Sequence, residues 1–303
     1  MAVYGLDIGG TKIETAIFDN ELNLIKSWRI STPTTDYQVF LETLCDLIHQ
    51  ADEFSQTQGH IGIGMPGLIN NNGQVLSANV PCATDKFIAQ DLEKLLNRPI
   101  AIKNDTRCFA LSEANGAGKQ YSRVFGAVIG TGAAGGLCID GKLEKTSLGM
   151  AGEYGHIPLP AHLQIKYNLP ITECGCGLTG CIESYIAGPG IKRLYQHFTH
   201  KTLDAKQWSC DLANNDEAAI KVLTCYLDLL GNTFASLVKL TEPDAIVIGG
   251  GISLVDAVIE SLPDAINSHL FKGFNAPVIL RAKYGDSSGV RGAAILGLQA
   301  SFE

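Results

Sequence analysis

The feature that most constrains this 303-residue chain is a repeat of its own opening. A shift of 121 positions aligns five identical residues without a gap: Val3, Gly5, Ile8, Gly9 and Asp19 with Val124, Gly126, Ile129, Gly130 and Asp140. In each copy a β-rich run enters a glycine turn and a second run leaves it, a pattern that predicts a β-hairpin. Two such hairpins in register indicate an internal duplication.

The two glycine turns are candidate phosphate-binding loops. Glycine lets the backbone approach an anion closely, and consecutive N–H groups form a concave nest. Thr11 and Lys12 can add a hydroxyl and a charge in the first turn, and Thr131 a hydroxyl in the second. Asp7 aligns with Val128, so only the first copy carries a strand carboxylate, which can hold Mg²⁺ directly or through water. A plain hairpin is the alternative reading. Neither turn is a Walker A loop or a Rossmann fingerprint, because each leads into a strand.

Composition narrows the class of protein. The length predicts about two domains, and 46% apolar residues can supply a core for each. A net charge of −8 argues against nucleic acid or an anionic membrane as the main partner, so a small molecule is expected. The chain enters a strand at once and has no run of about 18 apolar residues, which predicts a cytoplasmic protein.

Alternating strand and helix patterns predict an α/β fold. Helical spacing covers residues 37–54, 88–96 and 215–241, and a helix is expected to begin near Arg107. Apolar strands are expected at 60–65, 99–103 and 245–248, and residues 149–170 have a loop-like composition. The Gly-rich stretch 115–118 indicates a domain boundary.

Four residues have the chemistry of a metal site. His156, Cys174, Cys176 and Cys181 supply one imidazole and three thiolates, a closed tetrahedral set suited to structural Zn²⁺. Free thiols are the alternative, because the Cys-x-Cys spacing is tighter than the usual knuckle. The other six of the nine cysteines are scattered in apolar patterns and are expected to be small core residues.

Asp105 is the candidate general base. It follows an apolar strand at the edge where ligands meet α/β sheets, so it can accept a proton from a hydroxyl that attacks phosphorus. Capping of the next helix by Asn104 and Asp105 is the structural alternative. Polar groups on glycine-flanked loops favour a ligand with several hydroxyls, such as a sugar: Asn79, Asn104, Glu153, His156 and Glu183.

Motifs spread over essentially the whole chain resemble the ROK family, which comprises sugar kinases and related repressors of the actin-like ATPase superfamily. The resemblance rests on residues 7–12, Asn104-Asp105, residues 130–132, residues 153–156, the 174–181 knuckle with Glu183, and residues 248–251. Residues 79–81, 108–113 and 194–197 are most similar to members that phosphorylate N-acetyl-D-glucosamine.

The resemblance implies a two-domain, ribonuclease H-like fold: residues 1–118 plus 289–303 form a small domain, and residues 119–288 form a larger one with the zinc loop. It implies ATP-dependent phosphorylation of N-acetyl-D-glucosamine at the 6-hydroxyl, with Asp105 as base and both domains closing on the sugar. His156 would bind the sugar while its other ring nitrogen holds zinc. A homodimer is suggested too. The implied ATP-binding residues are Gly5, Asp7, Gly9, Gly10, Thr11, Lys12, Gly130, Thr131, Gly132, Ala133, Gly135, Gly136, Gly249 and Gly250.

Two departures from the family pattern leave alternatives open. Arg107 stands where the family usually has asparagine, and could pair with Asp105 or lower its pKa. Ala134 adds a methyl group in the second glycine turn. Glucose or N-acetylmannosamine is an alternative substrate, and a non-catalytic sugar sensor an alternative function. A repressor is not expected, because those relatives carry a helix-turn-helix domain ahead of the kinase-like part, whereas the first strand here begins at Val3.

Overall fold

The computed structural model describes residues 2–301, which divide into two compact units. Unit 1 contains the residues up to Gly116, Gly141–Ala151, and those from Lys283 onward. Unit 2 contains Ala117–Asp140 and Gly152–Ala282. The predicted domain limits at 118 and 288 stay a prediction.

Unit 1 is built on a mixed sheet with strand order β3-β2-β1-β4-β7. The antiparallel part is β1 (Val3–Ile8), β2 (Lys12–Phe18) and β3 (Leu24–Ser31), and β4 (His60–Met65) and β7 (Ile100–Asn104) extend it in parallel. Its helices are α1 (Tyr37–Ser55), α2 (Ile88–Leu96), α3 (Asp105–Ala114) and α10 (Ser288–Ala300). Short strands lie at β5 (Leu68–Ile69), β6 (Val75–Leu76) and β10 (Lys142–Leu143).

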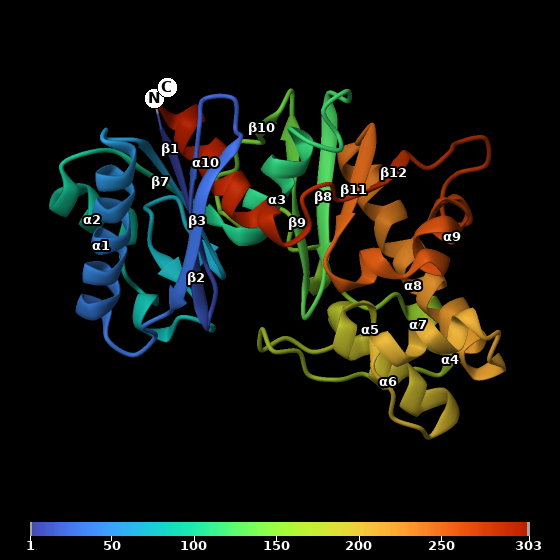
Figure 1. Cartoon of the computed structure of the whole chain (residues 1–303). Helices are drawn as coiled ribbons and strands as arrows, with labels where there is room; N and C mark the ends of the chain where they lie inside the picture. The colour runs from blue at the N-terminus through green and yellow to red at the C-terminus, as the bar shows by residue number, and fades with distance from the viewer. Residues whose placement is uncertain (1, 302–303) are drawn as a thin grey trace. The chain divides into compact units, whose positions relative to one another are not determined.

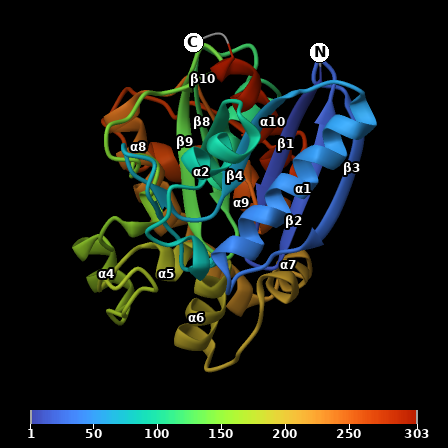
Figure 2. The same cartoon turned by 90° about the vertical axis from the view of Figure 1, so that its left-hand side faces the viewer.

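Alternation along β1 decides which helix covers which face of this sheet. Tyr4, Leu6 and Ile8 belong to the apolar cluster that contains the α1 side chains, and Figure 2 shows α1 lying across that face. Val3 clusters with residues of α10 instead, and α10 runs along the sheet in Figure 1. Asp7 lies four residues after Val3 on the same strand and therefore points to the same face, so its carboxylate is on the side covered by α10.

Glycine makes the close approach of α10 possible. A Cβ at Gly5 would lie 2.0 Å from the Val290 carbonyl oxygen, and one at Gly62 would lie 1.8 Å from that of Ala293. Both contacts are with helix backbone, which cannot rotate aside. The requirement for glycine at position 5 is therefore explained by helix packing, and its predicted part in ATP binding stays a prediction.

The second sheet has the full order β10-β9-β8-β11-β12, and the strands β9-β8-β11-β12, which belong to unit 2, repeat the order β2-β1-β4-β7 of unit 1. Its strands are β8 (Arg123–Ile129), β9 (Ala133–Ile139), β11 (Ala245–Gly249) and β12 (Val278–Arg281). Adding 121 to the first and last residue numbers of β2 gives those of β9. The predicted duplication of the hairpin and the α/β class are thus confirmed.

The helices of unit 2 are α4 (Ala161–Tyr167), α5 (Glu183–Ile186), α6 (Gly188–Thr199), α7 (Ala205–Ala213), α8 (Glu217–Thr241) and α9 (Asp256–Asn267). Helix α8 begins two residues later than the predicted range, because Asp216 caps it by accepting a hydrogen bond from the Ala219 amide. Gly231 lets α9 pack closely, since a Cβ there would lie 2.5 Å from the Ala265 oxygen. The loop-like expectation for 149–170 is wrong at α4, whose Leu163 is buried.

Candidate active site

Asp105 is the first residue of α3, directly after β7. The helix begins two residues before the predicted start because Asn104 caps it: Oδ1 of Asn104 accepts the Thr106 amide at 2.9 Å and the Arg107 amide at 3.3 Å. The Asp105 carboxylate accepts the Thr106 amide at 2.8 Å. Burial raises the pKa of Asp105, and this hydrogen bond offsets only part of the rise. Asp105 therefore binds a proton more readily than an exposed aspartate.

Asn104 has little hydrogen-bonding capacity left for a ligand. Its Oδ1 also accepts the Thr106 hydroxyl at 2.6 Å, and its Nδ2 donates to the Gly67 carbonyl at 2.9 Å. One amide hydrogen remains by count. Gly67 has φ +113°, and a Cβ there would lie 2.2 Å from the Leu76 oxygen, so only glycine fits this strand end. The capping alternative for Asn104 is correct, and its predicted contact with sugar is limited to that hydrogen.

Asp7 is a second partly buried acid, and it lies on the face of the sheet covered by α10. Burial, the charge of Asp105 and the charge of Glu14 together raise the pKa of Asp7 to about 7. Glu14 is itself paired with Arg29 at 2.6 Å. Because the charge of Asp105 raises the proton affinity of Asp7, a divalent cation beside them would be favoured, since its positive charge stabilises both carboxylates.

The Asp7 carboxylate is held against the start of α10. A Cβ at Gly289 would lie 2.3 Å from Oδ2 of Asp7 and 2.8 Å from its Cγ. Glu113, fully buried, fixes this helix end by accepting the Ser288 hydroxyl at 2.6 Å and the Lys283 amide at 2.8 Å. Sequence reasoning missed Gly289, because its reason for being glycine lies 282 positions away at Asp7.

The first glycine turn is closed by a hydrogen bond from the Gly9 amide to the Lys12 carbonyl, 2.8 Å. A Cβ at Gly10 would lie 3.0 Å from the Asn79 carbonyl oxygen, so the exposed residue Asn79 lies beside this turn. Lys12 is exposed and, by the alternation of β2, shares the face of Glu14, which pairs with Asp7. The charge of Lys12 is thus available on the side of the sheet that carries Asp7 and Glu14.

The second glycine turn is braced by Glu183, the first residue of α5. Its Oε2 accepts the Ala133 amide at 2.8 Å and would be 3.0 Å from a Cβ at Gly132. The Gly130 amide donates to the Gly132 carbonyl at 2.9 Å. The Ala133 amide is therefore occupied within unit 2. The predicted contacts of Ala133 with ATP and of Glu183 with sugar stay predictions.

Gly135 and Gly136 lie inside β9, away from the turn, where they pair with Ala127 and Gly126. A Cβ at Gly135 would lie 2.1 Å from the Gly126 oxygen, so strand packing explains this glycine. The predicted ATP contacts of Gly135 and Gly136 stay predictions. Ala134 pairs with Val128 in the same ladder.

A pocket of about 670 Å³ opens beside this turn in unit 2. Its polar lining includes Gly130 and Thr131 of the turn and Lys206, Ser209 and Cys210 of α7. Apolar walls are contributed by Ile129, Pro189, Ile252, Leu254 and Val255. The volume is within the range that holds drug-sized ligands.

The glycines at the end of β11, Gly250 and Gly251, have different roles. Gly250 has φ +76°, and a Cβ there would lie 2.4 Å from the Ile129 oxygen, so it brings the end of β11 against the end of β8. Gly251 is the member that lines the pocket. The sequence-based choice of Gly249 and Gly250 stays a prediction. The α7 residues were missed, since no motif marks them.

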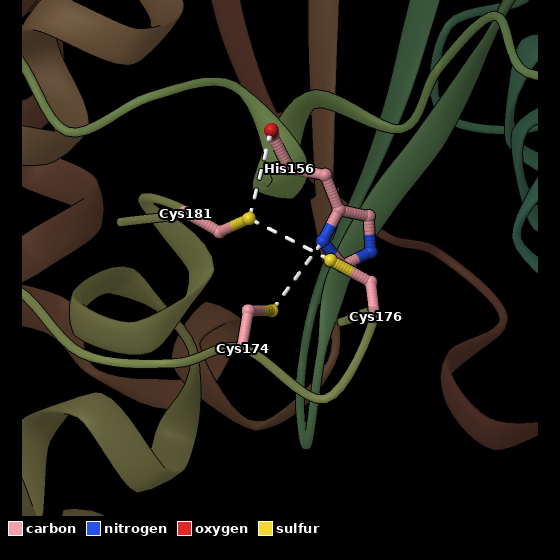
Figure 3. A group of neighbouring side chains, drawn as sticks. All are labelled: His156, Cys174, Cys176 and Cys181. Carbon is pink, nitrogen blue, oxygen red and sulfur yellow. Dashed lines mark hydrogen bonds between the residues drawn. The ribbon is translucent and has the colours of Figure 1, made fainter. Parts of the chain in front are cut away.

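The four predicted metal ligands gather in one place (Figure 3). Their donor atoms all lie within 4.8 Å of one another. Nδ1 of His156 is 3.6 Å from Sγ of Cys174, and Sγ of Cys176 is 3.7 Å from that of Cys181. Burial and the neighbouring thiols raise the pKa of Cys181 to about 12, so a bound cation is needed to hold it as thiolate. One imidazole and three sulfurs at this spacing fit Zn²⁺.

The two ring nitrogens of His156 lie in different environments. Nδ1 points to the cysteine cluster, and Nε2 lies 3.8 Å from Oε2 of Glu153. Both residues belong to the short 3₁₀ turn and its cap, Glu153 before Tyr154–His156. The predicted site residues thus fall into two sets: Gly5, Asp7, the first glycine turn, Asn79, Asn104 and Asp105 in unit 1, and the remainder in unit 2.

Comparison with known proteins identifies the family. The model of the ROK family matches residues 3–300. The chain belongs to the ROK family. The N-acetylgalactosamine kinase AgaK of Shewanella sp. (strain ANA-3) is 50% identical over 295 residues, which is 97% of this chain and 96% of that protein. The N-acetyl-D-glucosamine kinase of Pasteurella multocida (strain Pm70) is 42% identical over 97% of this chain and 99% of its own length.

Solved structures of ROK proteins agree with the fold. The ROK hexokinase from Thermus thermophilus superposes with a TM-score of 0.87 at 30% identity, covering 100% of both chains. A ROK glucokinase from Streptomyces griseus, solved with glucose and AMPPNP, gives 0.77 at 25% identity, covering 99% of this chain and 100% of its own. The actin-like fold implied by the family resemblance is confirmed. Across residues 2–301, none of the helices combines the length and apolar character that a membrane span requires.

Proposed function

We propose that this ROK-family chain is an ATP-dependent kinase that transfers the γ-phosphoryl group to the 6-hydroxyl of N-acetyl-D-glucosamine, forming N-acetyl-D-glucosamine 6-phosphate. The observation that carries the proposal is the partly buried Asp105 at the carboxyl end of β7, whose raised pKa suits a general base, together with a second partly buried acid, Asp7, whose pKa Asp105 raises. The two kinase relatives named above support the reaction class.

Asp105 accepts the proton of the 6-hydroxyl as that oxygen attacks the γ-phosphorus. The bond between the γ-phosphorus and the bridging oxygen breaks, and ADP leaves with the electron pair. A base with a raised pKa takes this proton more readily at neutral pH than an ordinary aspartate. The Thr106 amide donates to the Asp105 carboxylate at 2.8 Å and helps to hold it at the first turn of α3.

Asp7 is the residue that would hold Mg²⁺, directly or through water, and its carboxylate lies close against Gly289. Mg²⁺, when bound, neutralises charge on the transferred phosphoryl group. Lys12, exposed on the same face of the sheet, can add a positive charge there.

The pocket of unit 2 is proposed to bind ATP. Thr131 supplies a hydroxyl donor for the phosphates, and Gly130, with open space around its Cα, lets the backbone approach them closely. Ile252, Leu254 and Val255 offer an apolar wall for the base, and Lys206 a charge at the rim. The sugar is proposed to bind through Glu153 and His156, with zinc held by His156, Cys174, Cys176 and Cys181 in a structural role.

N-acetyl-D-galactosamine is a second candidate substrate, because the relative named for that sugar shares 50% identity with the chain. The two sugars differ only in configuration at C4. ADP release should therefore be measured with both, and with N-acetylmannosamine and glucose. A higher kcat/KM for either N-acetylated sugar of the first pair supports an N-acetylhexosamine kinase, and a preference for glucose contradicts it.

The base is tested by Asp105→Asn, which keeps the shape and removes the proton acceptor. We expect kcat to fall by roughly a hundredfold or more while the sugar still binds in calorimetry. A wild-type protein that binds the sugar and never releases ADP would be a sugar sensor instead. The predicted homodimer and cytoplasmic location stay predictions, and sedimentation tests the first.

A further inference from the structure

The pairing of β1, β2 and β3 sets three charged side chains in one row across the sheet of unit 1. Asp7 lies opposite Glu14, and Glu14 lies opposite Arg29. Side chains at opposed positions point to the same face of a sheet. That face is the one covered by α10, because Ala16, two residues after Glu14, clusters with residues of α10. Glu14 is therefore the charged neighbour of Asp7 on β2, and Arg29 is the next member of the row.

The other neighbour of Asp7 in this row is a glycine. Gly64 of β4 lies opposite Asp7, and a Cβ there would lie 3.6 Å from Oδ1 of Asp7 and 3.2 Å from Sγ of Cys108. The row thus places a carboxylate on one side of Asp7 and no side chain on the other. Of the two strands beside β1, only β2 brings a charge to Asp7 at this level of the sheet.

Arg29 holds Glu14 through a single oxygen. Nε and Nη2 of Arg29 donate to Oε2 of Glu14 at 2.9 and 2.6 Å, so Oε1 lies outside this pair. The Glu14 side chain is 14% exposed, and that of Arg29 is 53% exposed. The arginine is thus the solvent-exposed partner, and the carboxylate is largely enclosed beside Asp7.

Sheet stability does not explain this arrangement. Two like charges directly opposite each other destabilise a strand pair, and an ion pair with a half-exposed arginine stabilises a protein little. Burial and Asp105 raise the pKa of Asp7 most. Glu14 raises it further, whereas Arg29 lowers it, so the charges of both reach this carboxyl. A bound cation is the species that would make two neighbouring carboxylates favourable.

We propose that Glu14 supplies a second negative charge to the divalent-cation site of Asp7, and that Arg29 limits that charge. Mg²⁺ commonly binds one or two carboxylates together with phosphates of the substrate. Glu14 raises the affinity of the protein for the cation, and Arg29 lowers it by neutralising part of the Glu14 charge. The inference rests on the proposed function, which assigns the cation to Asp7.

The test measures binding of Mn²⁺ to the full chain without nucleotide or sugar, from the electron paramagnetic resonance signal of free Mn²⁺. Mn²⁺ prefers carboxylate to thiolate ligands, so it reports on this site and not on the cysteine cluster. We expect Glu14→Gln, which keeps the shape and removes the charge, to weaken Mn²⁺ binding about tenfold. Arg29→Met should tighten it about threefold, a smaller effect because solvent screens a half-exposed charge.

The matched control is Glu21→Gln. It removes the same charge from an exposed position beyond the far end of β2, and it should leave Mn²⁺ binding unchanged. If Arg29→Met does not fold, Arg29→Gln, which keeps an uncharged donor for Glu14, takes its place.

The direction of the two shifts separates this proposal from a structural role. Both variants lose the same ion pair, so a pair that only supports the sheet would change Mn²⁺ binding in one direction in both. Shifts in the same direction, no weakening in Glu14→Gln, or a wild type that binds no Mn²⁺ would each overturn the proposal. A loss in Glu21→Gln as large as that in Glu14→Gln would indicate a general charge effect and overturn it as well.

The proposed function has a separate readout. Asp7→Asn should abolish Mn²⁺ binding, and wild-type affinity in that variant would remove the cation from Asp7. Opposite shifts in a protein that phosphorylates none of the four sugars would leave the cation site standing and overturn the kinase. Shifts in the same direction in an active kinase would overturn only the roles of Glu14 and Arg29.

Discussion

Gly289→Ala is expected to remove most of the kinase activity and leave the protein folded. A Cβ at this position would lie 2.3 Å from Oδ2 of Asp7, whereas ordinary contact begins at 3.4 Å. The Asp7 carboxylate or the start of α10 must therefore move by about 1 Å. Movement of the helix is resisted, because Glu113 binds Ser288 and the Lys283 amide. We therefore expect the Asp7 carboxylate to move, and not the helix.

A misplacement of about 1 Å in a catalytic arrangement can cost on the order of a hundredfold in rate, about 2.7 kcal/mol of transition-state stabilisation. Stability should change little, because alanine favours a helix over glycine by up to about 1 kcal/mol and this offsets part of the cost of moving Asp7. We expect kcat to fall about a hundredfold with Tm within about 4 °C of wild type.

The assay is ADP release at saturating ATP and N-acetylated sugar over a range of Mg²⁺ concentrations, with Tm measured on the same samples. The control is the Asp7→Ala background, in which no carboxylate remains to collide with the new methyl group. Gly289→Ala should there cost less than about threefold further. A hundredfold loss in both backgrounds, or a wild-type rate in the single variant, would refute the reasoning.

Four further predictions concern stability, metal and nucleotide. Burial raises the pKa of Asp7 to about 7, so protonated Asp7 stabilises the Mg²⁺-free protein fully below about pH 4, and this contribution is lost as pH rises towards 7. In urea unfolding between pH 5 and 8, the free energy of unfolding of wild type should therefore fall by about 2–3 kcal/mol more than that of Asp7→Asn. An equal pH dependence of the two proteins would contradict this. Purified protein should contain about one Zn²⁺ per chain by elemental analysis, and Cys174→Ser should lower both the zinc content and Tm; a zinc-free protein of normal Tm would exclude the structural site. Gly62→Ala should cost about 3 kcal/mol or more in unfolding free energy, because its Cβ would lie 1.8 Å from the Ala293 oxygen; an unchanged denaturation midpoint is the contrary result. ATP should slow the reaction of Cys210, exposed at the rim of the pocket, with a maleimide, as read by mass spectrometry of the peptide; equal labelling rates with and without ATP would remove α7 from the nucleotide site.

Local and periodic signals made much of the fold predictable. The hairpin of unit 2 could be located from that of unit 1, and α2 was predicted at its observed bounds, because amphipathic spacing and glycine turns are local properties. The Cys and His cluster predicted to hold zinc could also be read from the sequence, since three of its members lie within eight residues and the structure brings all four together. Helices α4 and α7 were not predicted, because each is less than three turns long and buries a single large side chain, Leu163 or Trp208.

The sequence by itself determined the duplicated hairpins, the strand end that carries Asp105 and the donor set around His156, since each is encoded by neighbouring residues or by a regular period. Only the tertiary structure decided that Gly289 lies against Asp7 and that Arg107 donates a hydrogen bond to Thr146. These pairs are far apart in the chain, and backbone geometry brings them together: the packing of α10 on a glycine-lined face of the sheet, and the direction in which a helix points its third side chain. Such contacts leave no periodic signal, because each depends on the mutual fit of elements that are specified separately.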